Sequence, residues 1–552
     1  MVPFSVASLL ALSIVAATAS AEKDASLETS NFNVTEALLD HGVDVAEIPA
    51  LTDDGKRSEK KCAAAIILTN GEQCASLKFL YGDEAVETSE DAAYDAFTQT
   101  YWSGIQAEVN PYCIFKPSKA EHVSIVVLLS RLTQCPFAAK SGGHAAFAGA
   151  SSIEGGITVS FINLKGVSLS KNKKIASIGP GNTWGPVYEQ LTKSDVTVLG
   201  GRLSNIGVGG LTTGGGISYF SNLYGWACDS VESFEVVLAN GAIVKASSKQ
   251  HSDLYWALRG GGNNFGLVVN FNLITVPLPK GEMWGGTVIY SEDKFPEVAD
   301  AFVNIINNSP QDPKAGLWLT WAYFNGSKLA VPELYYAEPD GDAAAIFDDF
   351  TAIESISDTT QNQVLSEFAD ENMEVIPHGL REIYSVITTK VDHHLLAFAR
   401  DLFYENIPEL AGIPGISPNL VFQGITIPQL QHMKKNGGNA LGLDTADGPF
   451  FLILLSAMWE DKSDDAVVYQ WISDVLEKIT AEAKKRGVDN DYVYMNYASQ
   501  FQDVVATYGA SNKAKLKKVA KKYDPQQVFQ VLQPGYFKLD RAPVPNSGYF
   551  SH

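Results

Sequence analysis

Short apolar runs separated by turn-forming residues fill the first half of the chain. Between about residues 110 and 280, runs such as VTVLGG and FGLVVNFNLITV alternate with glycine-rich turns. This pattern predicts many strands in an α+β arrangement. Residues 236–244 place two β-rich runs around Asn240-Gly241, which predicts a hairpin. Helical spacing of apolar positions predicts helices over 121–132 and 184–193.

The pattern changes after Pro277-Leu278-Pro279, where glycine becomes scarce and longer helix-like stretches begin. We expect helices over 382–403 and 465–485, and strands over 317–324 and 450–458. A tyrosine-rich strand and a lysine-rich helix are expected near the C-terminal end. The 552 residues are too many for one hydrophobic core, so two or three domains are expected.

The N-terminus has the composition of a secretory signal. Residues 3–15 are apolar and uncharged, and small residues at 17–21 offer cleavage sites, so residues 1–21 are predicted to be a signal peptide. Three Asn-x-Ser/Thr sequons, at Asn33, Asn307 and Asn325, agree with a secreted glycoprotein. Residues 22–60 are polar, and we expect a loosely attached arm there.

Charge and cysteine content narrow the class of protein. The formal net charge of −22 would repel a phosphate backbone, so no nucleic acid partner is expected, and no later segment is apolar enough for a membrane span. The five cysteines form no CxxC motif, so no metal site is expected. One or two disulfides are expected among Cys62, Cys74, Cys113 and Cys135, with the pairing open, and at least one buried thiol should stay free.

Two glycine clusters carry the strongest chemical signal. The first is KSGGH at 140–144, and the second is GGRLSNIGVGGLTTGGG at 200–216, where eight of seventeen residues are glycine. Such loops let backbone N–H groups approach a pyrophosphate closely. His144 adds a nucleophilic side chain at the first loop. Together these features predict a phosphate-bearing cofactor with a covalent histidine tether.

Two alternative protein classes are also rich in glycine, but they fit this chain less well. Neither 179–184 nor 207–212 completes the GxGxxG fingerprint of a nicotinamide dinucleotide site. A β-solenoid or lectin-like protein would show a fixed repeat, and the clusters share no period.

Several motifs in the same order resemble a known family. The chain is similar to fungal FAD-linked oxidoreductases of the vanillyl-alcohol oxidase superfamily, in the berberine bridge enzyme-like branch. The matching segments are KSGGH (140–144), GPGNTW (179–184), GGRLSNIGVGGLTTGGGIS (200–218), DLYWALRGGGNNFGLV (253–268), YMNYASQ (494–500) and KKYDPQQVFQ (521–530).

The resemblance implies an α+β fold of PCMH type. It implies an FAD-binding domain of two α/β subdomains, a substrate-binding α/β domain with an antiparallel sheet, and a C-terminal segment that returns to the flavin. The predicted boundaries are 1–21 for the signal peptide, 22–105 for an N-terminal extension and the start of the FAD domain, 106–281 for the FAD-binding domain, 282–488 for the substrate-binding domain and 489–545 for the C-terminal segment.

The resemblance also assigns cofactor-binding residues. His144 would bond to the flavin 8α-methyl; the alternative is an ordinary loop histidine beside noncovalent FAD. Leu203 stands where some members carry a second, cysteinyl tether, so a single covalent bond is expected. Ile206 occupies the position thought to control oxygen access, and its β-branched shape favours an oxidase. The other predicted FAD contacts are Lys140, Ser141, Gly142, Gly143, Gly201, Gly207, Gly209, Gly210, Gly214, Val268 and Asn496.

Tyr494 and Tyr497 are the predicted catalytic residues. In a strand, Tyr494 and Asn496 share one face and Tyr497 the other, so a bend is needed for both tyrosines to reach the flavin. Tyr497 is the predicted base, which requires nearby positive charge or concerted hydride loss because a phenol has a high intrinsic pKa. The alternative is that both tyrosines only pack against the ring.

The predicted function is a secreted, monomeric FAD-dependent oxidase. It would transfer hydride from an alcohol or amine-type small molecule to flavin N5, with O2 as acceptor and H2O2 as product, in the tailoring of a secondary metabolite. Two alternatives remain: an extracellular carbohydrate or oligosaccharide oxidase, and a non-catalytic secreted glycan-binding protein.

Overall fold

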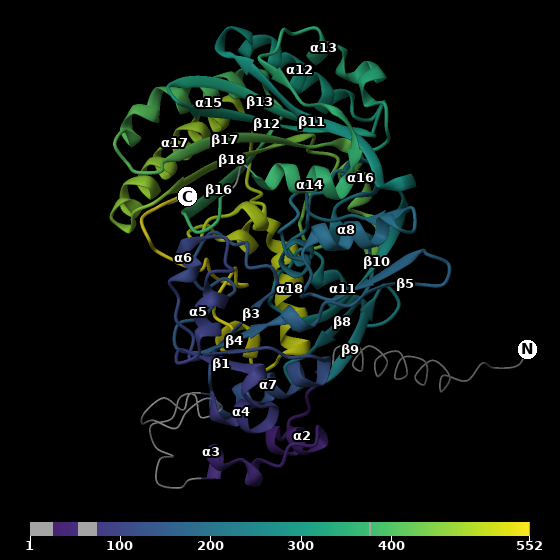
Figure 1. Cartoon of the computed structure of the whole chain (residues 1–552), viewed down its shortest axis with the longest axis vertical. Helices are drawn as coiled ribbons and strands as arrows, with labels where there is room; N and C mark the ends of the chain where they lie inside the picture. Colours follow the sequence, from purple (N-terminus) through teal and green to yellow (C-terminus); the bar gives the residue numbers. More distant parts are fainter. Residues whose placement is uncertain (1–25, 53–73, 375–376, 551–552) are drawn as a thin grey trace, which may run out of the picture.

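Three β-sheets follow one another along the chain in the computed structural model, which describes residues 26–52, 74–374 and 377–550 (Figure 1). The first two sheets and the C-terminal segment form one half of the molecule, and the third sheet forms the other half. The predicted α+β fold with an antiparallel sheet in its second half is confirmed.

The first sheet has four strands in the order β1-β2-β4-β3. The β1–β2 pair is antiparallel, and both pairs made by β4 are parallel. Helix α7 (Ala120–Thr133) connects β2 to β3 and confirms the helix expected over 121–132. The strands are β1 (Val86–Thr88), β2 (Cys113–Phe115), β3 (Phe137–Lys140) and β4 (Ile157–Ser160).

The second sheet has six strands, with β10 at its centre. The predicted hairpin is formed by β8 and β9, and Gly241 has the positive φ of 80° that its turn requires. Helix α8 (Trp184–Thr192) confirms the second predicted helix. The strands are β5 (Val167–Leu169), β6 (Ile175–Ile178), β7 (Val196–Val198), β8 (Val231–Val237), β9 (Ile243–Ser247) and β10 (Leu267–Pro277).

The third sheet has nine strands, and all its pairs are antiparallel. Helices α12 (Phe295–Asn308), α15 (His393–Asn406) and α17 (Asp465–Arg486) cover its outer face (Figure 1). The strands are β11 (Glu282–Ser291), β12 (Ala315–Phe324), β13 (Ser327–Tyr336), β14 (Ser357–Asp358), β15 (Gln361–Val364), β16 (Arg381–Lys390), β17 (Ser417–Ile425), β18 (Phe450–Trp459) and β19 (Asp489–Asn490).

Strand alternation gives the third sheet two different faces. On β18, Ile453 and Leu455 pack in the core beneath the helices, whereas Leu454 and Ser456 line a cavity on the opposite face. Successive side chains of a strand point to opposite faces, so one strand serves both the core and the cavity.

The helix predicted over 382–403 is partly wrong. Its first half is strand β16, and only its second half is helix α15. Asp392 marks the change, because its carboxylate accepts a hydrogen bond of 2.6 Å from the Leu395 amide and caps the helix. Helix α17 and strands β12 and β18 lie where the sequence predicted them.

The C-terminal segment returns to the first half of the molecule, as predicted. Helix α18 (Ala510–Tyr523) packs beside α11 (Ser252–Leu258). The tyrosine-rich strand expected before it is absent from the described residues: Met495–Tyr497 form a single 3₁₀ turn. This turn supplies the bend that a strand would have needed.

The expected loosely attached arm is also corrected for its described part. Helix α2 (Val34–Asp40) buries Leu38 against the first sheet and α7. Glu28 forms a bidentate ion pair with Arg131, with N–O distances of 2.8 and 3.0 Å. Residues 26–52 are therefore part of the folded core.

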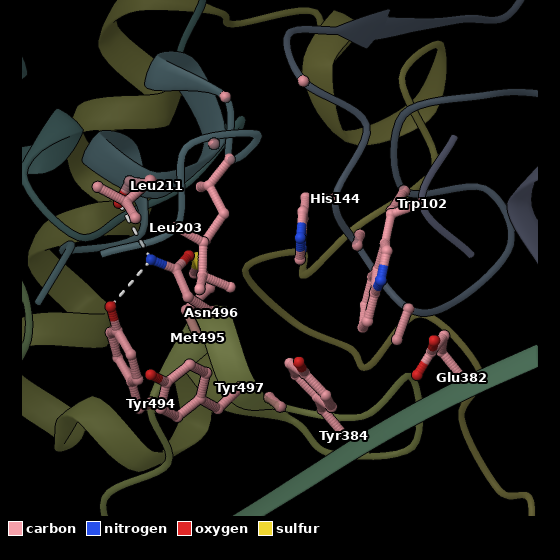
Figure 2. A pocket seen from close by; sticks show the side chains of 18 of the residues that line it. Trp102, His144, Leu203, Leu211, Glu382, Tyr384, Tyr494, Met495, Asn496 and Tyr497 are labelled. Atoms are coloured by element: carbon pink, nitrogen blue, oxygen red, sulfur yellow. Dashed lines mark hydrogen bonds between the residues drawn. The ribbon is translucent and has the colours of Figure 1, made fainter. Parts of the chain in front are cut away.

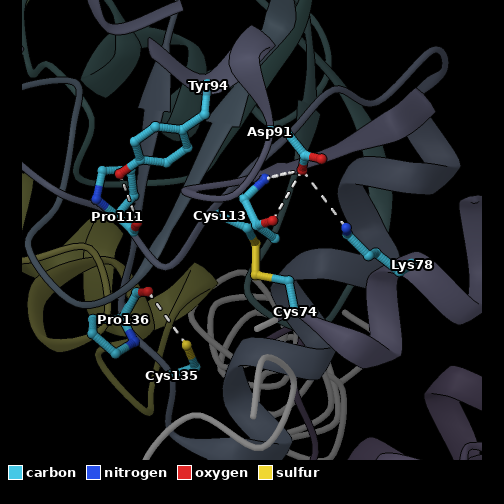
Figure 3. The surroundings of a disulfide bond; sticks show 9 residues. Cys74, Lys78, Asp91, Tyr94, Pro111, Cys113, Cys135 and Pro136 are labelled. Atoms are coloured by element: carbon cyan, nitrogen blue, oxygen red, sulfur yellow. Dashed lines mark hydrogen bonds and ion pairs between the residues drawn. A yellow bond between two sulfur atoms is a disulfide. The ribbon is translucent and has the colours of Figure 1, made fainter. Parts of the chain in front are cut away.

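A disulfide joins Cys74, at the start of α4, to Cys113 in β2 (Figure 3). Their Cα atoms are 6.1 Å apart. Cys228 carries a buried free thiol, as the odd cysteine count predicted. Cys62 and the predicted signal peptide lie outside the described residues.

The remaining helices are short. They are α3 (Pro49–Thr52), α4 (Ala75–Tyr81), α5 (Ala92–Thr98), α6 (Gly104–Ala107), α9 (Val208–Thr213), α10 (Ser221–Tyr224), α13 (Asp348–Thr351), α14 (Leu365–Glu374), α16 (Ile427–His432) and α19 (Val528–Val531). Within the described ranges, no helix combines the length and the hydrophobicity that a membrane span requires.

Candidate active site

A cavity of about 660 Å³ lies between the glycine loops of the first half and the inner face of the third sheet. The loop after β3, the loop before α9 and the C-terminal turn at 494–498 form one side of it. Strands β12, β16, β17 and β18 form the other side. The predicted site residues on its wall are Ser141, Gly142, Gly143, His144, Ile206, Gly207, Gly209, Gly210, Val268, Tyr494, Asn496 and Tyr497.

The two glycine loops touch each other backbone to backbone. A Cβ on Gly142 would lie 2.5 Å from the Gly207 nitrogen and 2.7 Å from its Cα. Ser141 ties the loops together, because its hydroxyl donates to the Pro180 carbonyl at 2.6 Å and accepts from the Gly209 amide at 3.0 Å. Such closely packed backbone forms the kind of cradle that a pyrophosphate fits.

Three predicted contacts lie outside the cavity wall. Lys140 points its Nζ at the rings of Phe97 and Tyr101, 5.1 and 4.9 Å from their centroids. Burial lowers the pKa of Lys140 to about 8. Gly201 makes room for the Trp184 ring, and a Cβ on Gly214 would collide with the Asn496 side chain. Because they lack a Cβ, Gly201 and Gly214 let these neighbouring side chains pack closely around the site.

His144 lies at the cavity wall. Its ring stacks on Trp102, with centroids 4.3 Å apart and an interplanar angle of 13°. Its Nε2 is buried and has no hydrogen-bond partner among the described residues. Burial lowers the pKa of His144 to about 4, so the imidazole is neutral at pH 7 and can act as a nucleophile.

Leu203 and Ile206 line the cavity on the second glycine loop. Figure 2 shows Leu203 and Trp102 on opposite sides of His144. The hydrocarbon side chain of Leu203 has no reactive atom that could form a covalent bond to a cofactor.

Tyr494 is anchored by backbone amides. Its hydroxyl oxygen accepts hydrogen bonds from the amides of Gly216 and Ile217, at 3.1 and 3.3 Å, and from Asn496 Nδ2 at 3.0 Å. The Asn496 amide also donates to the Leu211 carbonyl at 3.0 Å (Figure 2). Burial raises the pKa of Tyr494, so this phenol is neutral and fixes the C-terminal turn against the glycine loop.

Tyr497 has a different environment from Tyr494. Its hydroxyl oxygen accepts hydrogen bonds from Arg202 Nη2 at 2.6 Å and from Gln423 Nε2 at 2.9 Å. The Arg202 guanidinium also lies over Trp318, 4.5 Å from the ring centroid. A guanidinium keeps its charge at all physiological pH values, so a permanent positive charge contacts this phenol.

Sequence reasoning missed the residues Trp102, Arg202, Glu382, Tyr384 and Gln423, which all line the cavity. Arg202 could have been found, because it is the one charged residue in the glycine cluster at 200–216. Gln423 directly follows an apolar run in β17, which signals a sheet face turned toward a site. Glu382 lies in β16, whose many polar residues give no such signal.

The glycine cradle and His144 fit a phosphate-bearing cofactor, and comparison with known proteins identifies it. The FAD binding domain family matches residues 111–247, and the family described as berberine and berberine like matches residues 493–534. The FAD-dependent monooxygenase tpcD of Cochliobolus heterostrophus is 38% identical over 459 residues, covering 80% of this chain and 87% of that protein.

Two further proteins extend the comparison. The bifunctional solanapyrone synthase of Alternaria solani is 32% identical over 467 residues, covering 84% of this chain and 88% of that protein. The solved structure of berberine bridge enzyme from Eschscholzia californica superposes with a TM-score of 0.67 at 18% identity, over 82% of this chain and 97% of that one. The chain belongs to the berberine bridge enzyme-like family of FAD-linked oxidoreductases.

Family membership settles the cofactor and the class of activity. The protein is an FAD-dependent oxidoreductase acting on a small-molecule substrate, which excludes the non-catalytic glycan-binding alternative. The glycine cradle and the unpartnered His144 nitrogen are features of the described structure that fit FAD.

Proposed function

We propose that the protein oxidises an alcohol or amine-type small molecule, with Tyr497 as the base, and that O2 is the final electron acceptor. The contact between Arg202 and Tyr497 carries the proposal. A positive charge at hydrogen-bond distance stabilises negative charge on the phenol oxygen, which is the condition for Tyr497 to take a proton.

Bound FAD would accept the substrate hydride and deliver two electrons to O2, which leaves as H2O2. The protein supplies the remaining parts of the reaction. Tyr497 takes the proton of the substrate O–H or N–H while the neighbouring C–H bond breaks, so a C=O or C=N bond forms. Gln423 holds the Tyr497 oxygen in place, and Tyr494 and Asn496 hold the turn that carries it.

We also propose that His144 is the single covalent attachment point of the flavin. Its neutral, unpartnered imidazole supports this role, as does the hydrocarbon side chain of Leu203. Ile206 would leave a path for oxygen to the flavin, which agrees with an oxidase.

A secondary metabolite is the substrate class that we favour. Aromatic and branched side chains, including Trp318, Tyr384 and Val421, cover much of the sheet side of the cavity. One relative, the bifunctional solanapyrone synthase of Alternaria solani, is named for the synthesis of a small molecule, which agrees with such chemistry. A carbohydrate oxidase remains the second candidate, because Asn419 and Ser456 occupy paired positions on the same sheet face and could bind sugar hydroxyls.

The test combines oxygen uptake, H2O2 release and product mass with ¹⁸O2 as the gas. Equal amounts of O2 consumed and H2O2 formed, with no label in the product, support the oxidase. Label in the product would show a monooxygenase and refute the proposal. Parallel assays with a panel of aromatic alcohols, amines and oligosaccharides decide between the two substrate classes.

The cellular setting is proposed from the sequence. We propose that the protein is secreted through the signal at residues 1–21, is glycosylated, and acts as a monomer. Mass spectrometry of the mature N-terminus and of peptides containing Asn325, which lies exposed in the β12–β13 turn, tests the first two statements.

A further inference from the structure

Glu382 carries a buried carboxyl group at the wall of the cavity. The proposed reaction gives this group no role. The residue lies on β16 at the edge of the cavity near Trp102 and Tyr384 (Figure 2), and only 3% of its surface is exposed. Its Oε1 has no hydrogen-bond partner, and no ion pair of its carboxyl is found within the described residues. A buried polar group without a partner is costly, so its retention calls for an explanation.

Among the described residues, no positive charge compensates the Glu382 carboxyl. The Arg202 guanidinium is already bound to Tyr497 and Gln423 and stacked on Trp318. Burial raises the pKa of the Glu382 carboxyl well above its usual range. An isolated carboxylate in an apolar wall is much more costly than the neutral acid, so the group keeps its proton.

A second acid on the same sheet face provides a contrast. Glu333, on β13, also lines the cavity and is 3% exposed, but one of its oxygens, Oε2, accepts a hydrogen bond from the Thr287 hydroxyl. One of the two buried acids therefore has a side-chain hydrogen-bond donor inside the protein, whereas no hydrogen bond to the Glu382 carboxyl is found among the described residues.

The position of Glu382 assigns it to the far end of a bound molecule. Tyr384 follows it by two residues on the same face of β16, and the Tyr384 ring lies 6.1 Å from the Tyr497 ring. Glu382 is thus one strand repeat, about 6.6 Å, beyond Tyr384. The rings of Trp102 and Tyr384, with centroids 5.3 Å apart and planes tilted by 56°, form an aromatic wall beside it against which an aromatic ligand could pack.

We propose that Glu382 is a neutral acid that donates a hydrogen bond to a carbonyl oxygen of the substrate, and that this contact selects uncharged, oxygenated aromatic compounds over amines that carry a positive charge. The inference rests on the proposed function for the orientation of the substrate, with its reacting carbon at Tyr497. Glu382 acts as a specificity-determining residue at the opposite end. A neutral acid used as a hydrogen-bond donor in an apolar site has precedent in enzyme chemistry.

The first experiment observes the proton directly. Infrared difference spectra at neutral pH compare the flavin-loaded wild-type protein with Glu382→Gln, and Glu333→Gln is the matched control. We expect a protonated-carboxyl C=O band that Glu382→Gln removes and Glu333→Gln leaves in place. A band that persists in Glu382→Gln, or its absence from the wild type, would overturn the inference.

The second experiment measures selectivity with two probes of similar size, benzamide and benzylamine. Their binding near neutral pH is followed by the change that they cause in flavin absorbance, so no turnover is needed. We expect benzamide to bind about tenfold more tightly than the benzylammonium ion, Glu382→Gln to keep benzamide binding within about threefold, and Glu382→Leu to weaken it about tenfold. The amide of Gln retains a hydrogen-bond donor without a charge, and its similar shape guards against loss of folding.

Two results would reject the inference. One is preferred binding of benzylammonium that Glu382→Gln abolishes, which would mean a charged carboxylate. The other is the same affinity, or no binding, for both probes in all three proteins. Because binding does not depend on proton removal, failure of Tyr497 as the base would leave these outcomes unchanged, so the two proposals fail separately.

Discussion

Arg202 donates a 2.6 Å hydrogen bond to the hydroxyl oxygen of Tyr497, a residue 295 positions further along the chain. The contact joins the second glycine loop to the C-terminal turn. It distinguishes Tyr497 from Tyr494, whose oxygen is held by neutral amides. Two tyrosines three residues apart therefore have different chemistry, and this difference leads to the first predictions.

Replacing Tyr497 by Phe should slow flavin reduction by about 10²- to 10⁴-fold, the usual contribution of a positioned base. Stopped-flow absorbance under anaerobic conditions measures this step alone. Tyr494→Phe is the matched control, since it removes a hydroxyl that anchors the turn and does not face Arg202. A Tyr497→Phe protein that reduces its flavin at the wild-type rate would exclude the base role.

Arg202→Gln should lower the rate of flavin reduction at neutral pH. The variant removes the positive charge that stabilises negative charge on the Tyr497 oxygen during proton transfer. Anaerobic stopped-flow absorbance measures this rate. Gln can still donate a hydrogen bond, which separates the effect of charge from that of contact. Arg202→Lys restores the charge and should return part of the rate at neutral pH. An unchanged rate of flavin reduction in Arg202→Gln would show that the charge has no part in proton transfer.

His144→Ala should release the flavin into the supernatant on acid precipitation, whereas the wild-type pellet stays yellow. Trp102→Phe is the control variant, because it changes the neighbour of His144 but keeps an aromatic ring for His144 to stack on. Flavin that remains in the His144→Ala pellet would point to a different attachment site.

The rate of flavin attachment should also depend on pH in a defined direction. The pKa of His144 is lowered by burial to about 4, so protonation, which blocks nucleophilic attack, begins only well below neutrality. We expect a flat rate between about pH 5 and 8 and a decline below that range. A decline that begins near the ordinary histidine pKa would show that the ring is accessible to water during attachment.

Ile206→Leu should slow reoxidation of the reduced flavin by O2, because the γ-branch of Leu places two δ-methyl groups at the tip of the side chain, where they would cover the approach to the ring. A change of roughly tenfold corresponds to about 1.4 kcal/mol in the barrier. Mixing reduced enzyme with oxygenated buffer measures this step, and Val at the same position is the control that keeps the β-branch. Equal reoxidation rates for the Leu and Val variants would show that the side chain at position 206 does not control the access of oxygen to the flavin.

Glu28→Gln should lower the free energy of unfolding by about 3 to 5 kcal/mol, because it leaves Arg131 buried without its partner. The control is Glu338→Gln, which breaks the exposed pair with Lys314 and should cost at most about 1 kcal/mol. Chemical denaturation of the purified protein measures both values. Equal effects would mean that the N-terminal segment contributes little to the core.

Local sequence patterns predicted much of the first half because its signals are local. The Asn240-Gly241 turn and the glycine loops each show their structure within a few residues. Segment 381–390 carries a mixed signal, although Val386 and its β-branched neighbours favour a strand and Asp392 begins the following helix. Glu382 and Tyr384 face the cavity, and polar residues at such positions give a sequence pattern similar to that of the solvent-exposed side of a helix. The pattern therefore did not predict this strand.

The candidate site was only partly predictable for a different reason. His144 and the phosphate cradle come from one or two short loops, so their residue types identify them. The partners of Tyr497 come from the second glycine loop and from β17, and no local pattern relates Arg202 or Gln423 to a tyrosine near the end of the chain. Such contacts are set by the packing of the third sheet over the first half.

The C-terminal turn has a consequence for how the protein is made. Residues 494–497 close the cofactor pocket against the glycine loops, with Tyr494 bound to Gly216 and Asn496 seated on Leu211. A nascent chain therefore has no complete pocket until almost all of it has left the ribosome. We therefore expect flavin loading to be a late step of biosynthesis, and a chain that terminates before residue 494 to lack one wall of the cradle.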